Sequence, residues 1–276
     1  MSQDTIHHTD EHGDVDKWNP QLTEAIVALS RPLSKYFRAE VKGLENLPSG
    51  PALVVSNHSG GVLTPDMSVF AVSYYDTFGY DRPLYALGHD MLFRGPLAEL
   101  FRQTGVIKAT PENAVKALGS GGIVLVFPGG DHDAYRPTMA ENVVNFGGRT
   151  GYVTTAIEAG VPIVPAVSIG AQESQLFLTR GTGLTHALGL AKLGRKVGRS
   201  DILPITFGFP FGLSILTMPV NLPLPTKIVT EVLKPIDVVS EFGANPEVEN
   251  VDRRVRSIMQ TVMNRMARRR RFPIIG

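Results

Sequence analysis

A histidine lies directly after a strand-like run, where a general base could meet a substrate. The stretch ALVVSNHSGGVLTPD runs from Ala52 to Asp66, and its apolar run leads to His58. A loop histidine titrates near neutral pH and can take a proton from a hydroxyl group. A carboxylate beside the ring would hold its tautomer and stabilise the imidazolium. Asp66 can do so if Gly60-Gly61 folds the loop back.

Other arrangements of the same residues remain open. His58 could cap the following helix, which Asp66 would begin after Pro65, with no chemistry involved. Asp131 and Asp133 are rival partners for the imidazole if the strands that precede these residues are neighbours in a sheet.

A second group of polar residues occurs in VLVFPGGDHDAYRP, residues 124–137. A strand ends near Phe127, and Pro128-Gly129-Gly130 permits a tight turn with close backbone approach to a ligand. Charged and titratable side chains follow the turn: Asp131, His132, Asp133 and Arg136. The two acids and the histidine also suggest a metal site, but adjacent side chains seldom converge on one ion, so we expect no metal.

The elements that position these residues alternate between strand and helix. Strand-like runs cover residues 39–42, 52–56, 84–87, 123–127, 163–168 and 227–233. Helix-like patterns cover residues 66–76, 95–104, 111–119 and 150–159. This alternation predicts an α/β layered fold with a largely parallel sheet flanked by helices. Ligands of such sheets bind beyond the carboxyl ends of the strands, where His58 and the Pro-Gly-Gly turn fall.

Both ends of the chain have distinctive patterns. Residues 1–18 are acidic and His-rich and are predicted to be a disordered tail, which leaves residues 19–276 as a single domain. An apolar helical pattern from Leu22 to Phe37 is interrupted at Pro32, which predicts a helix-break-helix on the core or on a membrane.

The C-terminal segment reads as a basic amphipathic helix, with Asn245 as N-cap and Pro246 at the first position. Its apolar stripe comprises Val248, Val251, Val255, Ile258, Met259, Val262, Met263 and Met266, with arginines on the other face. The stripe either docks on the core or lies on a membrane surface.

An uncharged segment, residues 202–225, contains five prolines, which rule out a straight transmembrane helix. It is either a buried extended segment or a loop that dips into a membrane interface. Basic residues precede it: Lys192, Arg195, Lys196 and Arg199. They either form a solvated loop or meet anionic headgroups or the phosphates of a carrier.

Composition limits the classes of protein. With 276 residues, 43% hydrophobic and 19% charged, the chain fits one globular α/β domain, and a net charge of +1 argues against a nucleic-acid binder. The absence of cysteine excludes disulfides, thiolate metal sites and thiol nucleophiles. Met1 to Trp18 has no apolar signal region, so we expect a cytoplasmic protein.

Several blocks in order resemble the glycerolipid acyltransferase superfamily. They are GLENLPSGPALVVSNHSGG, then LGHDMLFRGPLAELFRQTGVIKATPENAVKALGSGGIVLVFPGG, then RTGYVTTAIEAGVPIVPAVSIG. The resemblance covers about residues 40–240 and is closest to the branch related to monoacylglycerol and diacylglycerol acyltransferases, in which Pro-Gly-Gly replaces Pro-Glu-Gly.

The resemblance implies a fold, an activity and roles for residues. His58 would be the general base, Asp66 its orienting carboxylate, and Phe127 to Gly130 the wall of the acceptor site. The donor would be acyl-CoA or acyl carrier protein, the acceptor a lipid hydroxyl, and no cofactor would be needed. Separately from the resemblance, the Arg-rich C-terminus and the apolar segment 202–225, neither of which can span a bilayer, predict peripheral binding to the inner face of a membrane. Further substrate-binding candidates are Asn57, Ser59, Gly60, Gly61, Lys108, Asp133, Arg136 and Arg149.

Three departures from the family pattern bear on the acceptor. The usual histidine-to-aspartate interval is four residues, whereas position 63 is Leu63 and the next acid is Asp66. His132-Asp133-Ala134 stands where Arg-Glu-Ala is common, so Arg136 or Arg149 would have to bind a phosphate. Lys108, where many members carry arginine, offers a point charge and no bidentate fork. Two kinds of acceptor are therefore compatible with the sequence: a lysophosphatidate, or a neutral or unusual molecule with a hydroxyl group.

The reaction itself needs a base on the hydroxyl and donors for the oxyanion, with no acyl-enzyme. Backbone N–H groups at Ser59–Gly61 or Gly129–Gly130 are candidate oxyanion donors. A serine hydrolase would need a Gly-x-Ser-x-Gly elbow, which the chain lacks. The alternative of another class is a non-catalytic lipid-binding or membrane-associated module that keeps the fold.

Overall fold

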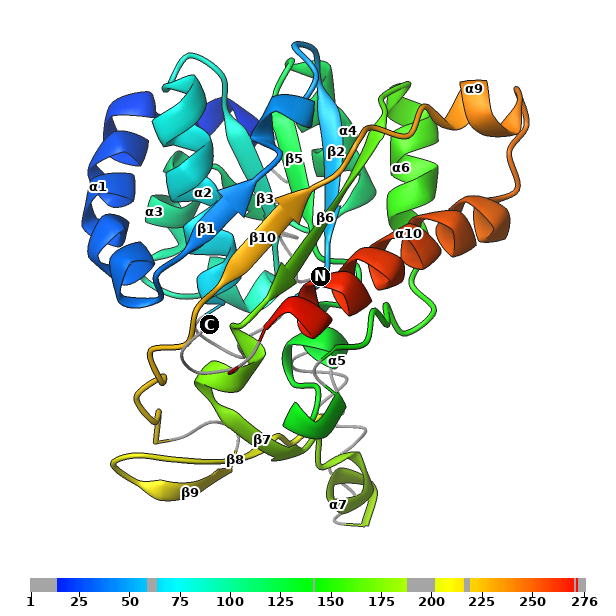
Figure 1. Cartoon of the computed structure of the whole chain (residues 1–276). Helices are drawn as coiled ribbons and strands as arrows, with labels where there is room; N and C mark the ends of the chain where they lie inside the picture. Colours follow the sequence, from blue (N-terminus) through cyan, green and yellow to red (C-terminus); the bar gives the residue numbers. More distant parts are fainter. Residues whose placement is uncertain are drawn as a thin grey trace, which may run out of the picture.

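The main sheet has seven strands in the order β1-β10-β6-β2-β5-β3-β4 (Figure 1). The computed structural model describes residues 14–58, 64–140, 142–187, 202–215, 219–270 and 272. The strands are β1 (Glu40–Lys42), β2 (Ala52–Ser56), β3 (Leu84–Gly88), β4 (Val106–Lys108), β5 (Ile123–Val126), β6 (Ile163–Ile169) and β10 (Val229–Val232). β6, β2, β5, β3 and β4 run parallel, whereas β10 is antiparallel to β6. The predicted α/β fold with a largely parallel sheet is confirmed.

Helices cover both faces of the sheet. α1 (Pro20–Tyr36) and α2 (Pro65–Phe78) lie on one face, and α4 (Pro111–Gly119), α6 (Gly151–Ala159) and α10 (Val248–Arg269) lie on the other (Figure 1). The shorter helices are α3 (Ala98–Gln103), α5 (Gly130–Ala134), α7 (Thr182–Ala187) and α9 (Val238–Phe242). Every side chain of β2 is buried, because alternate residues pack into opposite cores: Leu53 beside α6, Val54 beside α2.

The predicted break at Pro32 is wrong, because α1 is continuous from Pro20 to Tyr36. Asn19 caps the helix by accepting a hydrogen bond from the Leu22 N–H at 2.9 Å. Val27, before Pro32, packs into the core, and Leu33 after it packs beside Val69 of α2. Packing on both sides of the proline outweighs the one backbone hydrogen bond that it removes.

The C-terminal helix α10 is docked on the protein. It begins at Val248 with Glu247 as N-cap, two residues later than predicted. The apolar stripe, represented by Val255, Met259 and Met263, is fully buried in the core beside β6 and α6. The alternative in which this stripe lies on a membrane is therefore wrong.

The predicted disordered tail is too long at its C-terminal end. Val15–Lys17 form a turn of 3₁₀-helix, and Val15 is buried. Asp14 pairs with Arg102 at 2.7 Å, and the Tyr85 hydroxyl donates to the Val15 carbonyl at 3.2 Å. These contacts anchor residues 14–18, while residues 1–13 of the predicted tail lie outside the described residues.

A second sheet, of three antiparallel strands, lies beyond the carboxyl ends of the main parallel strands (Figure 1). It comprises β7 (Leu176–Thr179), β8 (Ile205–Gly208) and β9 (Gly212–Ile215). Segment 202–225 thus contains an exposed hairpin, so the prediction of a buried extended segment is wrong. The basic residues 192–199 lie outside the described residues. In the part of the chain that the structure describes, no helix is long and apolar enough to cross a bilayer.

Docking of α10 predicts a specific loss of stability. Met263→Ala removes a fully buried side chain and should lower the free energy of unfolding by about 2–5 kcal/mol in urea denaturation. Thr261→Ala, on the exposed face of the same helix, should stay within about 0.5 kcal/mol of the parent. Equal effects of the two substitutions would contradict the docking.

Candidate active site

Three neighbouring parallel strands bring the predicted residues to one edge of the sheet. β2 lies between β5 and β6, with Val55 opposite Val126 and Ser56 opposite Ala166. The residues that follow these strands therefore meet: His58 after β2, and the Pro-Gly-Gly turn and α5 after β5.

The imidazole of His58 contacts the carboxylate of Asp66. The ring Nδ1 lies 2.8 Å from Asp66 Oδ2, and the Asp66 side chain is 2% exposed. Asp66 belongs to the first turn of α2, and its Oδ1 accepts the Met67 N–H at 2.9 Å. Thr64, at φ +37°, takes the left-handed conformation that turns the chain into Pro65 and the helix. The contact is present despite the eight-residue interval.

Phe127 forms one wall of the histidine site. Its ring stacks on the imidazole with centroids 4.3 Å apart and planes 29° apart. Since β2 and β5 are paired, Phe127 leaves the sheet one strand away from His58. Only 13% of the His58 side chain is exposed.

The surroundings of His58 raise the pKa of the imidazole above its ordinary value of 6.5. Burial opposes the charged form, but the charge of Asp66, its hydrogen bond and the charge of Asp133 together outweigh burial. Because Asp66 holds Nδ1, Nε2 is the ring nitrogen that can take a proton from a substrate.

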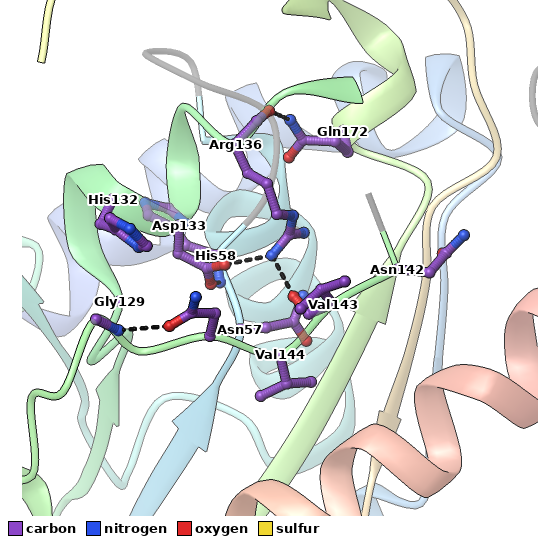
Figure 2. A network of polar contacts seen from close by, with 12 residues as sticks. Asn57, His58, Gly129, His132, Asp133, Arg136, Asn142, Val143, Val144 and Gln172 are labelled. Atoms are coloured by element: carbon purple, nitrogen blue, oxygen red, sulfur yellow. Dashed lines mark hydrogen bonds and ion pairs between the residues drawn. The ribbon is translucent and has the colours of Figure 1, made fainter. Parts of the chain in front are cut away.

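Asp133 supports the backbone of His58 from α5. Its Oδ2 accepts the His58 N–H, and its Oδ1 pairs with Arg136 (Figure 2). Burial raises the pKa of the Asp133 carboxyl to about 6, against the opposing effects of Arg136 and of the His58 N–H. Asp133 thus touches the backbone and not the ring. Asp131, the other rival, pairs with Arg149 at 2.7 Å.

Arg136 is buried. Its side chain is 2% exposed and also donates to the Val143 carbonyl at 2.6 Å (Figure 2). Gln172, after β6, donates to the Arg136 carbonyl. The three-residue spacing places Asp133 and Arg136 together at the end of a short helix. In the structure the Arg136 guanidinium is bonded to Asp133 and Val143, and binding of a substrate phosphate by Arg136 stays a prediction.

Asn57 likewise holds the scaffold together. It is fully buried, donates to the Ser168 carbonyl at 2.8 Å and accepts the Ser168 N–H at 2.9 Å. These bonds continue the pairing of β2 with β6 past the last strand residue. Both polar groups of the Asn57 amide bond to Ser168, and contact of Asn57 with substrate stays a prediction.

The Pro-Gly-Gly turn brings α5 close to β5. A Cβ on Gly129 would lie 2.4 Å from the Asp133 Cβ, so only glycine lets this carboxylate approach. Pro128 is buried, and Gly130, at φ +48°, donates its N–H to the Phe127 carbonyl at 3.0 Å. That N–H is therefore engaged in the turn and is not an oxyanion donor. Ser59, Gly60 and Gly61 lie outside the described residues.

Two predicted cations lie at different distances from His58. Arg149 donates to the Gly129 carbonyl at 2.7 Å and has a side chain that is 48% exposed. Lys108 ends β4, which is separated from β2 by β5 and β3, a span of about 14 Å at the usual strand spacing. Arg149 therefore lies beside the Pro-Gly-Gly turn. Lys108 lies at the same carboxyl edge of the main sheet, but three strands away from β2.

Sequence reasoning missed the partners supplied by the end of β6. Ser168 and Gln172 complete the bonds to Asn57 and to the Arg136 carbonyl. The one available signal was their position, since both polar residues stand at or just after the carboxyl end of a buried strand.

Several known proteins are similar to this chain in sequence or in fold. The family model described as Acyltransferase matches residues 38–169. A Mycobacterium tuberculosis protein named "Uncharacterized protein Rv0502" is 34% identical over 96% of this chain and 71% of its own length. The mouse "DGAT1/2-independent enzyme synthesizing storage lipids" is 29% identical over 63% of this chain and 50% of its own.

A solved structure shows the same fold. The 1-acyl-sn-glycerophosphate (LPA) acyltransferase PlsC from Thermotoga maritima superposes with a TM-score of 0.51 at 16% identity, over 88% of this chain and 79% of that one. The resemblance inferred from the sequence is thus confirmed. An acyltransferase model spans the histidine site, and a 34% identical relative aligns over 96% of this chain and 71% of its own length, so the chain belongs to the glycerolipid acyltransferase superfamily.

Proposed function

We propose that this protein is an O-acyltransferase that moves a fatty acyl group from acyl-CoA to a hydroxyl of a glycerolipid or other lipid alcohol. The observation that carries the proposal is the His58 imidazole, held by Asp66 and stacked on Phe127 at the carboxyl edge of the sheet. Acyl carrier protein is the alternative donor, and the transfer requires no cofactor.

The chemistry is a direct transfer. Nε2 of His58 takes the proton of the acceptor hydroxyl as its oxygen attacks the thioester carbonyl carbon. The tetrahedral oxyanion collapses, the carbon–sulfur bond breaks, and the leaving thiolate receives the proton from the imidazolium. Asp66 stabilises the imidazolium while it exists, which is consistent with the raised pKa of His58.

The acceptor is proposed to be neutral. Arg136, one of two arginines predicted to bind a phosphate, is buried in its pair with Asp133. Arg149 is exposed but already pairs with Asp131. A monoacylglycerol or diacylglycerol fits this arrangement better than a lysophosphatidate. The name of the mouse relative, which mentions storage lipids, supports the same class. We place the protein in the cytoplasm, peripherally on the inner face of a membrane.

Loss of the base should abolish transfer. His58→Ala should lower the rate of acyl transfer from labelled acyl-CoA by at least about a hundredfold. The measurement uses purified protein and a panel of monoacylglycerols, diacylglycerols, lysophospholipids and long-chain alcohols, with products separated by chromatography. The matched control is His186→Ala, an exposed histidine on α7, which should retain parent activity.

A folded His58→Ala protein with parent activity would refute the mechanism. A parent protein that binds these lipids and transfers no acyl group would instead favour the alternative of a non-catalytic lipid-binding module.

The pH profile should report the carboxylate partner. The base must be neutral, so kcat/KM falls as pH drops through the pKa of His58. Asp66→Asn removes the charge that raises this pKa while burial still lowers it, so the acidic limb should move to lower pH. The plateau should also fall by at least about tenfold, because the tautomer is no longer held. Asp237→Asn, at the N-cap of α9, is the control and should change neither quantity. An acidic limb that stays in place in Asp66→Asn would exclude Asp66 as the orienting group.

A further inference from the structure

Two strands of the three-stranded sheet β7–β9, β8 and β9, bury polar side chains and expose apolar ones. The inward positions in β8 and β9 are polar, since Thr206 is 4% exposed and Ser214 is 1% exposed. The alternating outward positions are large and apolar, with Phe207 at 53% and Leu213 at 58% exposure. A half-buried strand in a water-soluble sheet normally shows the reverse. The outward apolar face therefore needs a partner that is not water.

The outward side chains form one continuous surface, which we call the apolar face. Cross-strand pairing places Leu176 opposite Phe207, and Phe207 opposite Leu213. The row therefore crosses all three strands without interruption. Ile205 and Ile215 pair directly on the same side. Such a contiguous exposed apolar patch marks an interaction site.

The tip of the hairpin extends the apolar face and is rigidly held. Phe209 is 73% exposed and Phe211 57% exposed. Beneath them, the buried Asn221 accepts the Phe211 N–H at 3.0 Å and donates to the Gly212 carbonyl at 3.0 Å. Leu222, 61% exposed, donates its N–H to the Phe209 carbonyl at 2.8 Å. The aromatic side chains are thus presented on a fixed backbone.

The rim of the apolar face is basic and aromatic. The Tyr36 hydroxyl donates to the Pro223 carbonyl at 2.6 Å, and Arg38 donates to the Pro225 carbonyl at 2.9 Å. Lys35 is exposed in the same turn of α1. Described residues 176–179, 202–215 and 219–225 contain no carboxylate. An apolar surface with a tyrosine and cations at its edge complements the acyl boundary and the anionic headgroups of a bilayer.

A second copy fits this surface less well. In a two-fold pair the apolar face would meet itself, and its own described segments contain no carboxylate. Glu40, two residues after Arg38, already pairs with Lys227 and Lys42. A bilayer supplies both the apolar layer and the negative charge.

The apolar face is connected to the histidine site. Arg180, after β7, donates to the His132 carbonyl of α5 at 2.9 Å. The Phe177 N–H of β7 donates to the Thr138 hydroxyl at 2.9 Å, shortly after Arg136. The small sheet therefore lies against the segment that supports His58, at the carboxyl end of the main sheet (Figure 1).

We propose that the apolar face of β7–β9 is the surface by which this protein docks on a lipid bilayer. Docking brings the carboxyl edge of the main sheet to the membrane surface, where a water-insoluble acceptor would be taken up. This second statement rests on the proposed acyltransferase function, whereas docking itself does not.

The test is binding of the full chain to vesicles of equal parts phosphatidylcholine and phosphatidylglycerol, measured by co-sedimentation. The double variant Phe209→Ser/Leu213→Ser should lower the partition coefficient by at least about tenfold. The matched control is Leu29→Ser/Val239→Ser, whose side chains are 76% and 56% exposed on other elements, against 73% and 58% on the apolar face. The control should bind vesicles like the parent.

Three results would overturn docking. The first is unchanged vesicle binding by the face variant. The second is a parent protein that dimerises through this face, seen as a dimer that the face variant alone dissociates. The third is a fall in melting temperature in the face variant alone, which would mean that another part of this chain covers the face.

Measurements of acyl transfer distinguish an error in the docking proposal from an error in the proposed acyltransferase function. The face variant should keep parent turnover on a short-chain, water-soluble acceptor and lose at least about tenfold on the same acceptor class embedded in vesicles. His58→Ala should lose both activities while still binding vesicles. Loss of vesicle binding with unchanged turnover on the embedded acceptor would contradict the statement about uptake. Absence of transfer to either acceptor by the parent would refute the proposed function and leave the binding result valid.

Discussion

A buried carboxylate joins the parts of this site. Asp133 has no exposed surface, yet it accepts the backbone N–H of His58 and pairs with Arg136. An uncompensated charge in that position would cost several kcal/mol, so the carboxylate requires both partners. Arg136 in turn is bonded to Val143, in the segment after α5, and to Gln172, in a short 3₁₀-helix after β6. The position of His58 is therefore set by an ion pair that no substrate needs to touch.

The Pro-Gly-Gly block has a different role in the structure from the one that the sequence suggests. The sequence suggests a turn that admits a ligand, whereas in the structure Gly129 admits the Asp133 side chain. The glycine therefore serves the histidine indirectly, by allowing α5 to start close against β5. Phe127, the residue before the block, is the one that meets the imidazole directly.

The sequence predicts regular, locally specified features well. The limits of β2 and α4 match their apolar patterns, and the predicted contact between His58 and Asp66 is present. Features that depend on distant partners could not be predicted in this way. Burial of Asn57 depends on Ser168, more than a hundred residues away, and continuity of α1 through Pro32 depends on packing against α2.

The small sheet was missed for a different physical reason. Sequence patterns assume that apolar residues point inward, so an uncharged, proline-rich segment suggests burial. In β8 and β9 the apolar residues point outward and the polar ones inward, with Asn221 satisfying the turn. An inverted pattern cannot be recognised without knowing what the outer face meets.

The order of strands in the main sheet has a consequence for how the chain folds on the ribosome. β10 lies between β1 and β6, so β1, among the first elements synthesised, pairs in the described sheet only with a strand from near the other end. α10, which covers one face of the core, emerges later still. Vectorial synthesis must therefore leave β1 unpaired and an apolar face uncovered until almost the whole domain has been translated. Until β10 and α10 have been translated, the nascent domain exposes apolar surface of the kind that chaperones bind.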